Sequence, residues 1–268
     1  MSATGTATPV LQASNIVRRF GGVVAVNDAS LTVGEREIVG LIGPNGSGKS
    51  TMVNMVTGEQ QVNAGTMRFA GQDITALPAW KRARLGMARS FQMLRLFGSL
   101  SVQENLLLAH HTRMRHSAFA SFLGRKAAQA EERRVLERAR ELLAWFDLEA
   151  FADKPVSGMS IGQQRMVELA RGLIAEPRLF VLDEPAAGLS PPNVDRLMVL
   201  IQRMRDEFGM SILLVEHDMR VVRELCDHVV VLDSGNTIAR GEPEVVVADP
   251  KVIEAYIGSG WNRRAKAQ

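Results

Sequence analysis

The sequence predicts an α/β fold in which crossover helices connect the strands of a parallel sheet. In the second half of the chain, apolar strand-like runs alternate with helical stretches, as is typical of such sheets. The runs lie at 179–182, 211–215 and 228–232, and the helical stretches at 194–208 and 219–225. A glycine-rich loop also lies directly between an apolar run at 38–42 and a helical stretch at 51–56. This strand–loop–helix order belongs to the same fold class.

The first part of the chain reads as short strands separated by glycine-containing turns. These strands are expected at 11–17, 23–27, 31–33, 37–42 and 66–69. From residue 77 to residue 150 the pattern becomes helical. Four apolar residues of this region form one stripe on a charged helix, namely Val135, Ala139, Leu142 and Phe146. Because neither a repeat nor a long linker occurs, we expect the helical middle to be an insertion within one domain.

Composition limits the possible classes of protein. The chain has 268 residues, a net charge of +3 and 46% apolar residues, which is enough to build a core. Its apolar runs stay well below the roughly 20 residues of a membrane span, so we expect a soluble or peripheral protein. The single cysteine, Cys226, excludes an internal disulfide and favours a reducing compartment. Residues 1–9 and 259–268 read as tails.

The glycine-rich loop at 43–50 fits the Walker A pattern of phosphate binding. Its glycines are expected to let backbone N–H groups approach phosphate oxygens with no Cβ in the way, while the following helix directs its dipole there. Lys49 is expected to reach the outer phosphates, and the Ser50 hydroxyl to contact Mg²⁺. The alternative is a chance match, whose probability in a chain of this length is about one per cent from average residue frequencies. The nucleotide-binding residues are Gly43, Pro44, Asn45, Gly46, Ser47, Gly48, Lys49, Ser50 and Thr51.

Two adjacent carboxylates follow the apolar run at 179–182. One acid can hold Mg²⁺ while its neighbour activates the attacking water, so we assign Asp183 to the metal and Glu184 to the base. By itself such a pair often marks only the point where a strand reaches solvent. Because a phosphate loop lies upstream, the metal and base assignment becomes the favoured interpretation. A GTPase would need an Asn-Lys-x-Asp box, which the sequence lacks. Adenine is therefore the expected base.

A helix start at Ser160 offers a second phosphate site. Ser160 with Gln163 matches a capping box, so a well-capped helix at 165–175 and an anion site are equally good interpretations. Because one loop already surrounds the nucleotide of this chain, the anion site would serve the nucleotide of a partner molecule.

Together these motifs make the sequence similar to the ATP-binding cassette (ABC) family over about residues 10–258. Taken alone, most of the single residues read as ordinary core or surface positions, but their shared order carries the resemblance. In family order they are Phe20 as the aromatic that stacks on adenine, the loop at 43–50, Gln92 of the Q-loop, the signature at 159–163, Asp183 with Glu184, and His217 as the switch histidine.

The resemblance implies a P-loop NTPase of ABC type, with a RecA-like core, an antiparallel β subdomain and a helical subdomain at about 93–175. It also implies an ATP- and Mg²⁺-dependent subunit that powers a membrane transporter, working as a head-to-tail dimer of cassettes. Gln92 would contact Mg²⁺ and His217 the γ-phosphate. The signature residues implied to bind the partner's ATP are Ser160, Gly162 and Gln163. Two positions depart from the family pattern: Ile161 replaces a glycine, and Ser190 replaces the aspartate of the D-loop.

Within the family the sequence most resembles the larger ATP-binding subunit of high-affinity branched-chain amino acid importers. The segments that carry this resemblance are 20–27, 95–107, 183–189, 216–219 and 255–258. It implies import of branched-chain or other amino acids by a peripheral protein at the cytoplasmic face of the plasma (inner) membrane. The implied partners are transmembrane permeases, a second copy or a second ATP-binding subunit, and a substrate-binding protein.

Alternatives remain at this stage. Cassettes for urea or amide uptake and for lipopolysaccharide export share much of the pattern. A soluble ABC ATPase acting on nucleic acid or ribosomes is disfavoured because the chain has one Walker A loop, and we expect no nucleic acid partner. Basic residues concentrate in the insertion at about 110–134, since residues 111–140 carry a net +5. This basic face has two interpretations. It contacts anionic headgroups or a permease, where each charge would contribute ~1 kcal/mol to binding, or it is simply a solvated surface.

Overall fold

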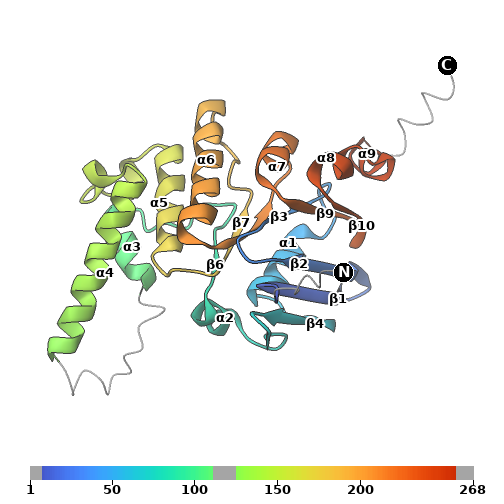
Figure 1. Cartoon of the computed structure of the whole chain (residues 1–268), viewed down its shortest axis with the longest axis horizontal. Helices are drawn as coiled ribbons and strands as arrows, with labels where there is room; N and C mark the ends of the chain where they lie inside the picture. Colours follow the sequence, from blue (N-terminus) through green and yellow to red (C-terminus); the bar gives the residue numbers. More distant parts are fainter. Residues whose placement is uncertain (1–7, 111–124, 258–268) are drawn as a thin grey trace, which may run out of the picture.

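Two sheets form the framework of the chain (Figure 1). The computed structural model describes residues 8–110 and 125–257. The smaller sheet is antiparallel and has the order β2-β1-β4-β5. Its strands are β1 (Leu11–Phe20), β2 (Val23–Val33), β4 (Ala64–Phe69) and β5 (Gln72–Asp73). The strands expected at 23–27 and 31–33 form the single strand β2, because the chain passes through Asp28 in a left-handed conformation, φ 53°, without leaving the sheet.

The larger sheet has six strands in the order β10-β9-β3-β8-β7-β6. Its neighbours pair in parallel from β9 to β6, and only β10 runs antiparallel. The strands are β3 (Ile38–Ile42), β6 (Met87–Arg89), β7 (Leu179–Asp183), β8 (Ser211–Val215), β9 (His228–Asp233) and β10 (Asn236–Gly241). Every residue of β3, β7 and β8 is buried, as expected for parallel strands covered on both faces. The expected parallel sheet is confirmed.

Helices cover the larger sheet on one face and contribute to the core on the other. They are α1 (Lys49–Thr57), α2 (Ala79–Leu85), α3 (Val102–His110), α4 (Arg125–Trp145), α5 (Ile161–Leu173), α6 (Pro191–Phe208), α7 (Met219–Leu225), α8 (Pro243–Val247) and α9 (Pro250–Ile257), with short 3₁₀ turns at Glu149–Phe151 and Val156–Gly158. In Figure 1, α5, α6 and α7 lie on one side of the sheet and the smaller sheet lies on the other.

Successive residues of the central strands alternate between two cores. Leu213 points into the core shared with α1 and the smaller sheet, whereas Leu214 points into the core shared with α5, α6 and α7. The predicted stripe on α4, from Val135 to Phe146, is at most 4% exposed and joins the second core. The stripe prediction is therefore confirmed.

The sequence did not predict several of the helices and strands. The strands β6 and β10 and the helices α8 and α9 were not expected, and α5 begins at Ile161 because Ser160 caps it there. β6 has three residues inside a region read as helical, and it forms because its backbone pairs with β7. The tails at 1–7 and 258–268 and most of the basic insertion, residues 111–124, lie outside the described residues. Within 8–110 and 125–257, no helix is long and apolar enough to cross a membrane.

Candidate active site

The predicted motifs meet at the carboxyl edge of the larger sheet. In the sheet, Val215 of β8 pairs with Leu41 of β3 on one side and with Asp183 of β7 on the other. The phosphate loop therefore follows β3, His217 follows β8 and Glu184 follows β7 at the same edge. Segments more than 130 residues apart are brought together because parallel strands all end on the same side.

Two glycines of the phosphate loop lie close to the backbone of neighbouring segments. A Cβ on Gly43 would lie 2.0 Å from the Leu232 carbonyl oxygen, and a Cβ on Gly48 would lie 2.5 Å from that of Ala25. These two glycines make room for the protein's own neighbouring backbone. Only Gly46, φ 80°, faces open space. That the glycines let backbone N–H groups approach phosphate oxygens stays a prediction.

Lys49 lies at the start of α1 and is 7% exposed. Its Nζ donates to the carbonyl oxygens of Gly43, at 2.7 Å, and Pro44, at 3.0 Å. Burial lowers the pKa of Lys49, and the carboxylates of Glu184 and Asp183 oppose that shift. The ammonium group therefore lies within the electrostatic reach of the predicted base Glu184 and the predicted metal ligand Asp183.

The loop fits a phosphate and a magnesium ion. The hydroxyl of Ser47 is buried and has no hydrogen-bond partner within the described part of the chain, so it can donate to a phosphate oxygen. Ser50 follows Lys49 on α1, and Asp183 and Gln92 supply further oxygens of the hard type that Mg²⁺ prefers. Within the described ranges no group of three His, Cys, Asp or Glu side chains could hold a metal.

Glu184 is held in a left-handed backbone conformation, φ 47°. Its N–H donates to the Val215 carbonyl at 2.9 Å, and its Oε2 accepts from Gln92 Nε2 at 2.7 Å. The Nδ1 of His217 lies 3.9 Å from the same Oε2. Such a conformation is uncommon outside glycine and concentrates at functional sites. The structure thus brings together the three residues that we predicted to be catalytic.

Asp183 has a partner that the sequence did not indicate. Its Oδ2 pairs with Arg89 Nη2 at 2.8 Å, and Arg89 also contacts Glu59 at 3.0 Å and Asn54 at 2.7 Å. Arg89 therefore joins the end of β7 to α1 and to Glu59, two residues beyond the end of that helix. Its position three residues before Gln92 was the only sequence signal, and it was not sufficient to assign a role.

A buried glutamate connects the catalytic segments after β7 and β8. Glu216 is 1% exposed and accepts hydrogen bonds from the N–H groups of Ala186, at 3.0 Å, and His217, at 3.1 Å. Burial raises the pKa of Glu216, while these hydrogen bonds oppose the shift. Glu216 thereby holds the His217 backbone against the loop that follows Glu184.

The signature residues cap α5, which lies apart from α1 in Figure 1. Ser160 and Gln163 form the expected capping box, in which each side chain contacts the other's backbone N–H. Gly162 packs closely on α6, since a Cβ there would lie 3.1 Å from Asn193 Nδ2. The Ile161 side chain is 57% exposed. Its replacement of a usual glycine is therefore accommodated without a clash inside the chain.

The predicted adenine contact lies at the end of β1. Phe20 is 43% exposed, and the Arg18 guanidinium lies 4.5 Å from the centre of its ring. An exposed ring with a cation over one face can stack on a flat aromatic base.

The Q-loop is supported by a buried ion pair on α5. Arg165 and Glu168 are each 2% exposed and pair at 2.5 Å. Glu168 Oε1 accepts from the Phe91 N–H at 3.2 Å, and Arg165 donates to the Phe91 carbonyl at 3.1 Å. Burial raises the pKa of Glu168, and Arg165 opposes that shift. The backbone next to Gln92 is thus fixed by the helix that carries the signature.

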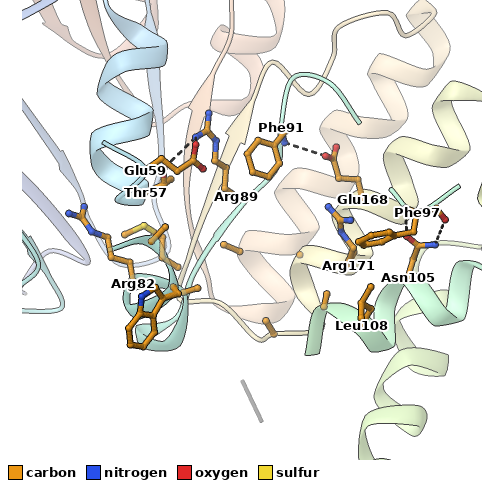
Figure 2. A pocket seen from close by; sticks show the side chains of 18 residues that line it. Thr57, Glu59, Arg82, Arg89, Phe91, Phe97, Asn105, Leu108, Glu168 and Arg171 are labelled. Carbon is orange, nitrogen blue, oxygen red and sulfur yellow. Dashed lines mark hydrogen bonds and ion pairs between the residues drawn. The ribbon is translucent and has the colours of Figure 1, made fainter. Parts of the chain in front are cut away.

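A groove of about 830 Å³ lies behind the Q-loop, between α2, α3 and α5 (Figure 2). It is lined by Phe91, Phe97 and Leu108, together with charged residues that include Arg89 and Glu168. Phe97 is 52% exposed and Leu108 41%. Apolar side chains exposed together in a groove are typical of a protein contact site.

Asn105 fixes one wall of the groove. It is fully buried, accepts from the Phe97 N–H at 2.9 Å and donates to the carbonyls of Phe97 and Ser101. The exposed Phe97 side chain is therefore held by a rigid loop (Figure 2).

Comparison with known proteins shows the family of this chain. The family model described as "ABC transporter" matches residues 26–187, and the model described as "Branched-chain amino acid ATP-binding cassette transporter" matches residues 236–261. The chain belongs to the ABC transporter family and is one of its ATP-hydrolysing cassettes. The P-loop fold of ABC type and the family expected from the sequence are confirmed.

Relatives of known description span nearly the whole chain. The chain is 42% identical to "High-affinity branched-chain amino acid transport ATP-binding protein BraF" of Pseudomonas aeruginosa and 38% identical to LivG of Escherichia coli, each over 93% of this chain and 98% of the relative. It is also 34% identical to "Lipopolysaccharide export system ATP-binding protein LptB" of Haemophilus influenzae, over 93% of this chain and 97% of that one.

Solved structures show the same fold. A nucleotide-free ATP-binding cassette from an ABC transporter has a TM-score of 0.81 and 32% identity, covering 94% of this chain and all of that one. A dimeric cassette in a post-hydrolysis state, bound to ADP and Pi, has a TM-score of 0.72 and 25% identity, covering 87% of this chain and 98% of that chain.

Proposed function

We propose that this chain is the ATP-hydrolysing subunit of an importer of branched-chain or other amino acids. The observation that carries the proposal is the combination of two features in one chain. Lys49, Glu184 and His217 gather at one sheet edge, and residues 236–261 match the branched-chain amino acid cassette model. The descriptions of BraF and LivG support the same cargo class.

ATP would bind across the phosphate loop. Backbone N–H groups of residues 45–51 and the Lys49 ammonium would donate to its phosphate oxygens, while the exposed ring of Phe20 would stack on adenine. Ser50, Asp183 and Gln92 would hold Mg²⁺, which supplies charge neutralisation at the β- and γ-phosphates. To do so, Asp183 must share its carboxylate with Arg89, its partner at 2.8 Å.

Glu184 acts as the general base in this proposal. It accepts a proton from the water whose oxygen attacks the γ-phosphorus, and ADP and inorganic phosphate leave. Gln92, bound to Glu184 at 2.7 Å, orients that carboxylate. His217 donates a hydrogen bond to the γ-phosphate, and its distance of 3.9 Å from Glu184 is consistent with both acting on one phosphate.

A second cassette would complete the site. Ser160, Gly162 and Gln163 cap α5, and the N–H groups at a helix start favour a phosphate. These residues would bind the ATP of a paired cassette, either a second copy or a different ATP-binding subunit. The exposure of Ile161 leaves room for that contact, while Ser190 in place of the usual aspartate alters the D-loop. The dimeric cassette bound to ADP and Pi supports this arrangement.

The groove behind the Q-loop would receive a transmembrane permease subunit, which places the chain at the cytoplasmic face of the membrane. Its exposed Phe97 and Leu108 offer an apolar surface, and Phe91 in its wall is adjacent to Gln92. A permease segment seated there would therefore contact the backbone that holds Gln92 on Glu184. A substrate-binding protein would complete the importer.

Reconstitution tests the transport proposal. The chain would be assembled in ATP-loaded proteoliposomes with the permeases, the substrate-binding protein and any shorter cassette encoded beside it, and uptake of labelled leucine, urea and a short amide compared. We expect ATP-dependent leucine uptake. Uptake of urea or amide alone would reject the cargo, and assembly only with lipopolysaccharide export components would reject import.

The groove is tested separately with Phe97→Glu. We expect this substitution to reduce reconstituted transport at least about tenfold, because it places a charge in an apolar interface core. The ATPase activity of the isolated chain should stay within twofold of wild type. Val199→Glu is the matched control, since Val199 is 55% exposed on α6 and does not line the groove. Equal transport by both variants would reject the groove as the permease site.

A further inference from the structure

The start of the phosphate loop is held by the last described helix. The Gly43 N–H donates to the Tyr256 hydroxyl of α9 at 2.7 Å, across 213 residues of sequence. The carbonyl oxygen of the same residue accepts from Lys49 Nζ at 2.7 Å. Gly43 therefore lies between a tyrosine from the C-terminal part and the lysine that reaches the phosphates.

The other end of the loop is held by the same part of the chain. The Gly235 N–H, in the turn between β9 and β10, donates to the Ser47 carbonyl at 2.9 Å. The Leu232 carbonyl fills the space that a Cβ on Gly43 would need. We call Leu232, Gly235 and Tyr256 the C-terminal clasp. The two hydrogen bonds of the clasp restrain both sides of the loop that we propose binds the phosphates.

The ring and the hydroxyl of Tyr256 have separable roles. Tyr256 is 36% exposed, and the helix that carries it, α9, packs against β10 and α8. Burial raises the pKa of the Tyr256 hydroxyl, and the hydrogen bond from Gly43 opposes the shift, so the group is a neutral phenol near pH 7. A neutral phenol accepts the Gly43 N–H and retains its own proton. The ring can anchor α9 without the hydroxyl, but only the hydroxyl can orient the Gly43 peptide.

We propose that Tyr256 is a positioning residue for ATP binding, which acts by fixing the Gly43 peptide and with it the start of the phosphate loop. The proposal rests on the assignment of residues 43–51 to the ATP phosphates. If the hydroxyl is lost, the N–H of the Ile42–Gly43 peptide loses the partner that fixes it, and the dihedral angles of Gly43, which set the direction of the carbonyl that accepts from Lys49, are less restrained. Ordering the loop then becomes part of the cost of binding, which weakens affinity.

The test compares four full-length proteins: wild type, Tyr256→Phe, Ile253→Ala and Lys49→Ala. Ile253 is an exposed residue of the same helix and serves as the matched control. Each protein is measured for equilibrium binding of a fluorescent ATP analogue with Mg²⁺, for kcat and KM of ATP hydrolysis, and for its melting temperature. In Tyr256→Phe we expect Kd and KM to rise about three- to tenfold, the usual effect of one lost hydrogen bond, with kcat within twofold.

The outcomes distinguish the role of the Tyr256 hydroxyl from the assignment of residues 43–51 to the ATP phosphates. Wild-type Kd in Tyr256→Phe, or a lowered melting temperature without a change in Kd, would overturn the role of the hydroxyl. An equal rise of Kd in Ile253→Ala would also overturn it, because any disturbance of α9 would then suffice. If Lys49→Ala binds ATP as wild type does, the phosphate loop itself is wrongly assigned. Loss of binding in Lys49→Ala with the expected shift in Tyr256→Phe supports both.

Discussion

Gln92 donates a hydrogen bond from Nε2 to Oε2 of Glu184 at 2.7 Å. The Q-loop residue and the proposed base thus form one unit, although they come from different strand ends. The backbone beside Gln92 is held by Arg165 and Glu168 of α5 and lines the groove. A displacement of this segment by a bound partner would therefore reach Glu184 through a single hydrogen bond.

Replacing Gln92 tests that hydrogen bond. We expect Gln92→Ala to lower kcat about tenfold or more, because Glu184 loses the group that orients it. The Kd for ATP without Mg²⁺ should stay within twofold of wild type, since Gln92 does not contact the phosphate loop in this arrangement. Phosphate-release kinetics and equilibrium binding measure the two quantities. An unchanged kcat would contradict the orienting role, and Gln103→Ala on the nearby α3 serves as the control.

Replacing Glu184 tests the base. We expect Glu184→Gln to reduce kcat at least about 100-fold, because an amide accepts no proton from the attacking water. ATP should still bind, and the two-cassette complex should last longer because its ATP is not consumed. Single-turnover hydrolysis and sedimentation with ATP give the two readouts. Hydrolysis at the wild-type rate would mean that another group is the base.

The buried pair of Arg165 and Glu168 should matter far more for stability than an exposed pair of equal spacing. We expect Glu168→Gln to lower the free energy of unfolding by about 3–5 kcal/mol, because it leaves the Arg165 charge buried without a counterion. The matched control is Glu141→Gln, which breaks an exposed i,i+3 pair with Arg138 and should cost about 0.5 kcal/mol or less. Urea denaturation compares them, and equal losses would contradict the argument.

Cys226 gives a pH-dependent prediction. Burial raises its pKa to about 12, well above the ordinary 9.0, so the folded thiol should resist alkylation at pH 8 and react after denaturation. The unfolded thiol ionises first as pH rises, so the folded state then holds more protons. Stability should therefore fall between about pH 9 and 12. The fall should be smaller in Cys226→Ala, measured by denaturation at each pH. Rapid alkylation of the folded protein would contradict the buried location.

Local sequence patterns were sufficient to predict the features that depend on residues close together in the chain. The phosphate loop, the Asp183–Glu184 pair and the α4 stripe each depend on residues close together in sequence, and periodicity or spacing is enough to recognise them. The same holds for the Ser160 cap, whose partner is Gln163. The parallel sheet followed from the alternation of strands and helices, and it predicts that the ends of β3, β7 and β8 share one edge.

The sequence by itself determined the class of fold and the family, and it named the residues that we propose carry ATP hydrolysis. Only the tertiary structure decided which of these residues meet and what holds them. The bond from Gln92 to Glu184, the pairing of Arg89 with Asp183 and the contact of Tyr256 with Gly43 each join distant segments. No local pattern encodes such contacts, because they depend on how the strands order in the sheet and where the last helix packs.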